Sequence, residues 1–268
     1  MDKFYRFVMR ILIVISFILL ANFDVKAEEN TEIGYGQEPI NTALLDLSEQ
    51  ISKDAYRVLK EKQGSDARVE VGIYDLNRAD YQFVTTYFLY SFCVDGGVPW
   101  LSYADMGGGK VRVSLLNTII SDDYFAKHDQ VYDQLQQISD ECAGKSERAK
   151  VEYFYKTIVD KCNYVDRDDT HFMYTVLNHG EACCQGVATT FYRLCYIMNG
   201  IPCDITYGLL DGDLELPHAW NRIVVDGVMS TCDLTVDLSG KGKLGFLMLF
   251  TNNVVKYYYL SGTYRTMM

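Results

Sequence analysis

The chain has 268 residues, of which 49% are hydrophobic and 13% aromatic, with 4 prolines against 20 glycines. This composition excludes intrinsic disorder and collagen-like repeats, because such chains bury too little apolar surface to offset the entropy lost on ordering. The formal net charge of −11 argues against nucleic acid or an anionic membrane surface as a partner of the whole chain. The length suits one large domain or two smaller ones.

Residues 1–27 have the pattern of a secretory signal peptide. Three basic side chains precede an apolar run at 11–21, and residues 25–27 offer a small-residue cleavage site. A membrane span needs about 20 apolar residues, so this run is short for one. We therefore predict cleavage and secretion, with no stable membrane insertion afterwards. An uncleaved anchor that retains the protein at the cell surface is the alternative.

The chain contains eight cysteines, a number that suggests disulfide bonds in an exported protein. Their spacing is irregular: Cys93, Cys142, Cys162, Cys183, Cys184, Cys195, Cys203 and Cys232. If one of them is a working thiol, the remaining seven cannot all pair within one molecule. The sequence leaves the connectivity open.

The first half of the mature chain predicts a mixture of helix and strand. Residues 40–62 carry apolar side chains at helical spacing, which predicts an amphipathic helix. Residues 68–75 and 110–116 alternate apolar and polar side chains, the pattern of half-buried strands. Residues 81–93 are rich in aromatic side chains, and their pattern fits a helix or a strand equally well. We assign residues 28–145 to an N-terminal α+β extension.

The remaining residues, 146–268, are predicted to form the domain that carries the chemistry. Cys184 opens its central helix, because the apolar or small side chains at 184, 188, 191, 195 and 198 share one face. The positive end of the helix dipole and the unpaired N–H groups favour a thiolate there and can stabilise an oxyanion. Cys183, about 100° around the helix, is predicted to point away from the core, so we prefer Cys184 as the nucleophile.

A histidine and an aspartate follow on a predicted hairpin. His218 begins an alternating strand, Asp226 and Gly227 give a hairpin turn signal, and Asp233 follows the returning strand. The hairpin would place the imidazole and the carboxylate on neighbouring strands, within reach of a hydrogen bond. Cysteine, histidine and aspartate together form the activated nucleophile of acyl-transfer enzymes. Asp226 and Asp237 are the alternatives to Asp233.

These three motifs resemble those of the transglutaminase-like superfamily, whose members have a papain-like fold. The family pattern joins a Cys-x-Gly helix start, a His-Ala-Trp-Asn strand and an Asp-x-Thr segment. This chain has Cys184–Ala188, His218–Asn221 and Asp233–Thr235, with Gly227 six residues before Asp233. The resemblance covers roughly residues 147–237.

The resemblance implies an α+β fold in which the cysteine helix packs on an antiparallel sheet that carries the histidine and the aspartate. It also implies roles: Cys184 as nucleophile, His218 as general base and acid, and Asp233 as the orienting carboxylate. Exported bacterial members of the family often carry an N-terminal α+β extension of this size. We expect Gln185, Gly186 and Trp220 to bind substrate.

The implied activity is that of a cysteine enzyme that acts on the amide carbonyls of a protein or peptide through an acyl-thioester, without a cofactor. Water as the second substrate would make a peptidase or amidase, which we expect. An amine would make a cross-linking acyltransferase, the first alternative.

Departures from the family pattern suggest a second alternative. Met229 and Ser230 replace the usual Trp-Tyr, Val236 replaces a tryptophan, and Ala182 replaces a glycine. The chain could therefore be a catalytically silent extracellular binding module that keeps the fold.

No metal site is predicted. The cysteines near His218 contain no C-x-x-C pair of the zinc type. The acidic clusters at 166–169 and 211–215 lack the spacing of an EF-hand loop.

Overall fold

The computed structural model describes the following residues: 39–62, 68–92, 94–95, 100–116, 121–210, 217–238, 245–247 and 257–259. The predicted signal peptide, Cys93 and the acidic cluster at 211–215 lie outside these ranges. Among the described helices, none is long and apolar enough to cross a membrane.

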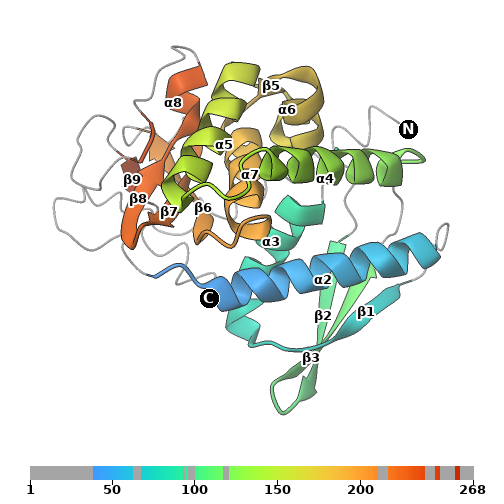
Figure 1. Cartoon of the computed structure of the whole chain (residues 1–268). Helices are drawn as coiled ribbons and strands as arrows, with labels where there is room; N and C mark the ends of the chain where they lie inside the picture. Colours follow the sequence, from blue (N-terminus) through green and yellow to red (C-terminus); the bar gives the residue numbers. More distant parts are fainter. Residues whose placement is uncertain are drawn as a thin grey trace.

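The fold belongs to the α+β class, as predicted. Its N-terminal part consists of α2 (Thr42–Glu61), β1 (Val69–Asp75), α3 (Tyr81–Phe92), β2 (Trp100–Gly107) and β3 (Lys110–Leu116), with a short 3₁₀ turn before α3 at Arg78–Asp80. The strands form an antiparallel sheet in the order β1-β3-β2, and α2 packs against β1 and α3 (Figure 1). The division of the chain into domains stays a prediction.

Residues 81–92, which fit either element in the sequence, form the helix α3. Aromatic side chains are buried at Phe83, Tyr87, Phe88 and Phe92, which is helical spacing. The opposite half of the helix carries Gln82, Thr85, Thr86 and Leu89 and no charged side chain, so little hydropathy contrast marks the helix in the sequence. The Tyr87 ring meets the Tyr192 ring of α7 (Cys184–Tyr192) edge-on, with their centroids 5.3 Å apart, so α3 joins the N-terminal sheet to the second part.

The second part contains helices around α7. They are α4 (Tyr124–Asp140), α5 (Glu147–Lys161), η2 (Asp168–His171), α6 (Met173–His179), α7 (Cys184–Tyr192), its π-helical continuation η3 (Arg193–Ile197) and α8 (Leu234–Leu238). Two short strands, β4 (Asn163–Tyr164) and β5 (Glu181–Ala182), pair in parallel just before α7. The sequence patterns at 122–142 and 146–162 predict two helices, which α4 and α5 confirm.

The sheet of the second part is antiparallel, with the order β8-β7-β6-β9. Its strands are β6 (Cys203–Leu210), β7 (Pro217–Val225), β8 (Val228–Cys232) and β9 (Tyr257–Tyr259). The predicted hairpin is confirmed: Asp226 and Gly227 turn with φ of 52° and 77°. The buried Asn221 side chain of β7 donates to the carbonyls of Ala188 in α7 and Asp204 in β6, and this fixes the helix on the sheet.

A buried ion pair joins α2 to the end of the α7–η3 helix. The Arg193 side chain is completely buried, and its Nη1 lies 2.5 Å from Oε2 of Glu49. The guanidinium also donates to Ser91 and lies over the ring of Tyr132. Burial works to raise the pKa of Glu49, but the charge and hydrogen bonds of Arg193 hold that pKa below its usual value.

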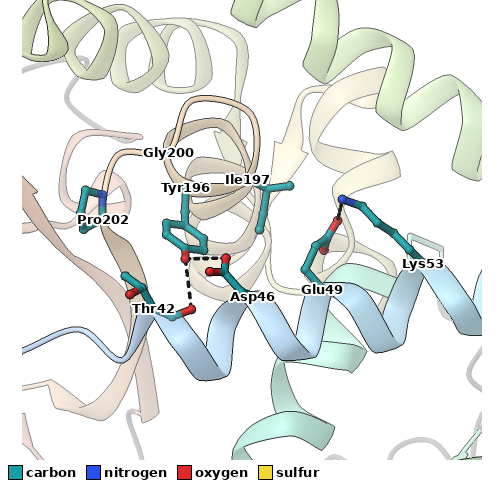
Figure 2. A pocket seen from close by; sticks show the side chains of 8 residues that line it. All are labelled: Thr42, Asp46, Glu49, Lys53, Tyr196, Ile197, Gly200 and Pro202. Atoms are coloured by element: carbon teal, nitrogen blue, oxygen red, sulfur yellow. Dashed lines mark hydrogen bonds and ion pairs between the residues drawn. The ribbon is translucent and has the colours of Figure 1, made fainter. Parts of the chain in front are cut away.

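A cavity of about 460 Å³ lies along the same seam between α2 and η3 (Figure 2). The Tyr196 hydroxyl donates there to Oδ1 of Asp46 and to the carbonyl of Thr42. The lining of this cavity includes none of the predicted catalytic residues.

We predict that Glu49→Ala lowers the free energy of unfolding by about 3–5 kcal/mol, because it leaves the Arg193 charge buried without its carboxylate. Lys53→Ala is the matched control, since this lysine pairs with the same carboxylate but is 71% exposed. It should change the stability by less than about 1 kcal/mol. Urea denaturation measures both, and equal effects would contradict the prediction.

Candidate active site

Cys184 is the first residue of α7, as predicted. Two glycines that make close backbone contacts fix the position of the start of α7. Gly180, with φ of 65°, ends α6 in the left-handed conformation, and Gly186 lies against the carbonyl of Thr170 in η2. A Cβ atom on Gly186 would lie 2.2 Å from that oxygen, so only glycine allows the approach.

His218 and Asp233 form a buried hydrogen-bonded pair. Nε2 of His218 lies 2.7 Å from Oδ2 of Asp233, and the side chains are 8% and 0% exposed. The carboxylate accepts the Nε2 proton, which leaves Nδ1 as the nitrogen with a lone pair. The other carboxylate oxygen, Oδ1, accepts the backbone N–H of Thr235 at 2.9 Å.

The backbone of Asp233 is held as firmly as its side chain. Its N–H donates to the carbonyl of Gly245, and its own carbonyl accepts the Tyr155 hydroxyl. A Cβ atom on Gly245 would lie 1.8 Å from the Asp233 carbonyl oxygen, so this position also requires glycine.

The two alternative aspartates are engaged elsewhere. Asp237 accepts hydrogen bonds from the Tyr155 hydroxyl at 2.6 Å and from the Gly245 N–H at 3.0 Å. Asp226 lies in the exposed hairpin turn and pairs with Arg148. Of the three aspartates, the structure brings Asp233 to His218.

The Cys184 sulfur lies beside the strand that carries His218. The backbone N–H of Ala219 donates to it, and the negative charge of Asp233 acts on it. The hydrogen bond to Cys183, burial and the charge of Cys183 raise the pKa of Cys184 well above its usual value. The helix N-terminus, which the sequence analysis expects to favour a thiolate at Cys184, opposes these effects, and that expectation stays a prediction.

The predicted orientation of Cys183 is wrong. Its side chain is 1% exposed, whereas Cys184 is half-buried. The reason is that Cys183 precedes the helix with extended backbone, φ −96° and ψ −179°, so its side chain does not follow the helical period. The greater exposure of Cys184 still makes it the more accessible nucleophile.

His171 is a site residue that the sequence reasoning missed. Its Nδ1 lies 3.3 Å from Oε1 of Gln185, and its imidazole hydrogen-bonds to Cys183. Burial acts to lower the pKa of His171, but the hydrogen bond and charge of Cys183 outweigh it and raise the pKa. The residue stands in an irregular segment between β4 and α6, where no periodicity or motif marks it.

Of the three residues predicted to bind substrate, Trp220 lies beside His218, whereas Gln185 and Gly186 contact η2. Gln185 is half-buried and bound to His171, and Gly186 is buried beneath η2. Trp220 is 1% exposed, and its ring stacks near that of His218 with centroids 5.9 Å apart. Their contact with substrate stays a prediction.

No disulfide bond joins two of the cysteines in the described ranges. Within the same ranges, no group of three or more His, Cys, Asp or Glu side chains is arranged to hold a metal ion.

Comparisons with known proteins agree with the motifs. Residues 136–229 match the model of the transglutaminase-like superfamily, a range that includes Cys184 and His218 and ends four residues before Asp233. A comparison with curated proteins gave no match.

Two solved structures are similar at low identity. One is a TGase, with 17% identity and a TM-score of 0.37, and the similarity covers 70% of this chain and 57% of that one. The other, from Cytophaga hutchinsonii, is described as a putative cysteine protease, with 15% identity, a TM-score of 0.35 and coverage of 60% and 66%. This chain thus spans less than two thirds of the length of either protein.

We predict that Gly186→Ala destabilises the protein by about 1–3 kcal/mol, because the new methyl group would overlap the Thr170 carbonyl. In an ordinary helix the same change stabilises by roughly 0.5–1 kcal/mol. Thermal or urea denaturation therefore distinguishes the two cases by the sign of the change. A more stable variant would show that η2 does not lie against α7.

Proposed function

We propose that residues 136–229, which match the model of the transglutaminase-like superfamily, form a domain of that kind, and that this protein is a cysteine enzyme that acts on amide or peptide carbonyls through an acyl-thioester on Cys184. The observation that carries the proposal is the buried His218–Asp233 pair beside the half-buried Cys184 at the start of α7. The Thr235 N–H holds the Asp233 carboxylate, and the Ala219 N–H donates to the Cys184 sulfur.

The geometry suggests how the first half of the reaction would proceed. Nδ1 of His218 takes the Cys184 proton as the sulfur attacks the carbonyl carbon. Asp233 stabilises the imidazolium that forms. Backbone N–H groups at the start of α7 stabilise the oxyanion, and the imidazolium then gives its proton to the leaving amine. The acyl group remains on the sulfur as a thioester.

In the second half, a nucleophile resolves the thioester. Water would release a carboxylic acid, and we propose this route, that of a peptidase or amidase on protein or peptide substrates outside the cell. A primary amine would give a new amide, the reaction of a cross-linking acyltransferase. The triad is the same for both.

The test uses p-nitrophenyl acetate as the acyl donor and the purified full chain. We predict a burst of one p-nitrophenolate per protein and one acetyl group on Cys184. Cys184→Ala should abolish the burst, whereas Cys183→Ser should still form the acetyl-enzyme. His218→Ala should slow acetylation by roughly 10²–10⁴-fold, because the general base is lost. Rapid-mixing absorbance and peptide mass spectrometry give these values.

The same experiment separates the alternatives. No burst in the wild-type protein would favour the silent binding module. An acetyl group on Cys183 would show that Cys183, and not Cys184, is the nucleophile, and would contradict the proposal. Methylamine added to the acetyl-enzyme reports the second step: acetate as the product supports the hydrolase, and N-methylacetamide supports the acyltransferase.

A further inference from the structure

The proposed mechanism gives no role to η2, the short 3₁₀ turn that packs against the start of α7. Thr170 of this turn is completely buried, and its carbonyl accepts the backbone N–H of Cys183 at 3.2 Å. The same oxygen occupies the space where a Cβ atom on Gly186 would lie. The turn is therefore fixed on the first residues of the helix that carries Cys184.

Side-chain contacts also hold the shape of η2 itself. The backbone N–H of Arg167 donates to Oγ1 of Thr170 at 3.1 Å, and that hydroxyl donates to the Arg167 carbonyl at 2.7 Å. The Arg167 guanidinium pairs with Asp169 in the turn and with Glu181 of β5, the strand just before α7. These contacts hold His171, the last residue of η2, at a defined place beside the helix.

His171 forms a hydrogen bond with Gln185, the residue that follows the proposed nucleophile. Its Nδ1 lies 3.3 Å from Oε1 of Gln185, and Nδ1 is the donor because an amide oxygen only accepts. At the opposite edge of the ring, Nε2 lies 4.0 Å from Oδ1 of Asp166, a carboxylate that favours a proton on that nitrogen. The imidazole therefore determines which way the Gln185 amide faces.

This hydrogen bond leaves the nitrogen of the Gln185 amide available. Because His171 holds Oε1, the amide directs Nε2 away from that imidazole. Among the described contacts, Nε2 donates to no protein group, and the side chain is half-buried next to Cys184. The two N–H donors of an amide nitrogen match the carbonyl oxygens of a peptide backbone. The side chain is thus suited to hold a carbonyl group of an acyl chain that is attached to Cys184.

The acceptor for Gln185 is a different carbonyl from the one that is attacked. The proposed mechanism assigns the attacked carbonyl to backbone N–H groups at the start of α7. The Gln185 side chain leaves the helix about 100° around from that of Cys184, so its amide is displaced sideways from the sulfur. A peptide offers a second carbonyl on its acyl side, whereas a simple ester such as an acetate does not.

We propose that Gln185 donates a hydrogen bond from Nε2 to a backbone carbonyl in the acyl part of a peptide substrate, and that His171 is the positioning residue that orients the Gln185 amide. The inference rests on the proposed function of Cys184. It makes Gln185 a residue that selects acyl groups with a peptide carbonyl over simple acyl groups.

The test compares two p-nitrophenyl esters on the purified full chain by rapid-mixing absorbance. p-Nitrophenyl acetate has only the attacked carbonyl, whereas the p-nitrophenyl ester of N-benzyloxycarbonyl-glycine adds a carbamate carbonyl where a peptide has its next one. The preference is the ratio of kcat/KM for acylation by the second ester to that by the first. We expect Gln185→Ala to lower this preference by roughly 5–10-fold, the effect of one lost hydrogen bond.

Matched variants separate the hydrogen bond from the packing of η2. Gln185→Glu can still accept from His171 but cannot donate at neutral pH, so it should lose the preference as Gln185→Ala does. His171→Asn keeps a donor close to the position of Nδ1 and should retain most of the preference. His171→Leu has no donor and should lose it. Urea denaturation confirms that each variant is folded.

An unchanged preference in folded Gln185→Ala or Gln185→Glu would overturn the proposal. A His171→Asn variant that loses as much as His171→Leu would overturn the positioning role of His171.

The outcome is separable from that of the proposed function. If His218→Ala leaves acetylation by p-nitrophenyl acetate unaffected, the mechanism on Cys184 fails, whatever the preference shows. If acetylation depends on His218 but the preference does not depend on Gln185, only the role of Gln185 and His171 fails.

Discussion

The hydrogen bond between His218 and Asp233 is the contact on which the proposed chemistry of this protein depends. Its 2.7 Å length and the burial of both side chains fix the tautomer of the imidazole and leave Nδ1 as the basic nitrogen. A free histidine in water would sample both tautomers and many orientations. The β7–β8 hairpin removes that freedom by placing the two residues at adjacent strand ends.

The rest of the second part serves to hold this pair and to bring α7 against it. Asn221 binds the Ala188 carbonyl and so connects β7 to α7 at the level of the site. Gly186 and Gly245 allow backbone approaches that any side chain would block. At the far end of the same helix, Arg193 pairs with Glu49 of α2, so the N-terminal helix anchors the element that begins with Cys184.

Cys183 and Cys184 differ in environment more than their adjacency in sequence suggests. The helix begins between them, and the extended backbone of Cys183 turns its sulfur inward to His171. Cys184 faces the strand of His218 and remains accessible.

Much of the fold followed from local patterns. The helix start at Cys184 and the hairpin turn at Asp226 depend on residues close in sequence, so periodicity and turn preferences were enough to predict them. The helix at 81–92 could not be told from a strand, because the half that faces away from its buried side chains carries no charged residue and gives little hydropathy contrast.

The contacts that the sequence could not predict are those made through irregular backbone. His171 lies in a 3₁₀ turn twelve residues before Cys183 and fourteen before Gln185, and no spacing rule connects such positions. The prediction of the Cys183 orientation was wrong for a related reason, because it applied the helical period to a residue that lies just outside the helix.

The most direct test of the catalytic role of the His218–Asp233 pair compares acetylation of Asp233→Asn and Asp237→Asn by p-nitrophenyl acetate. An amide at 233 cannot stabilise the imidazolium, so we expect acetylation to slow by roughly 10³–10⁴-fold. Asp237 binds Tyr155 and Gly245 without touching the histidine in the described contacts, and its variant should lose less than tenfold. Wild-type acetylation in Asp233→Asn, or an equal loss in both variants, would contradict the assignment of Asp233 as the catalytic carboxylate.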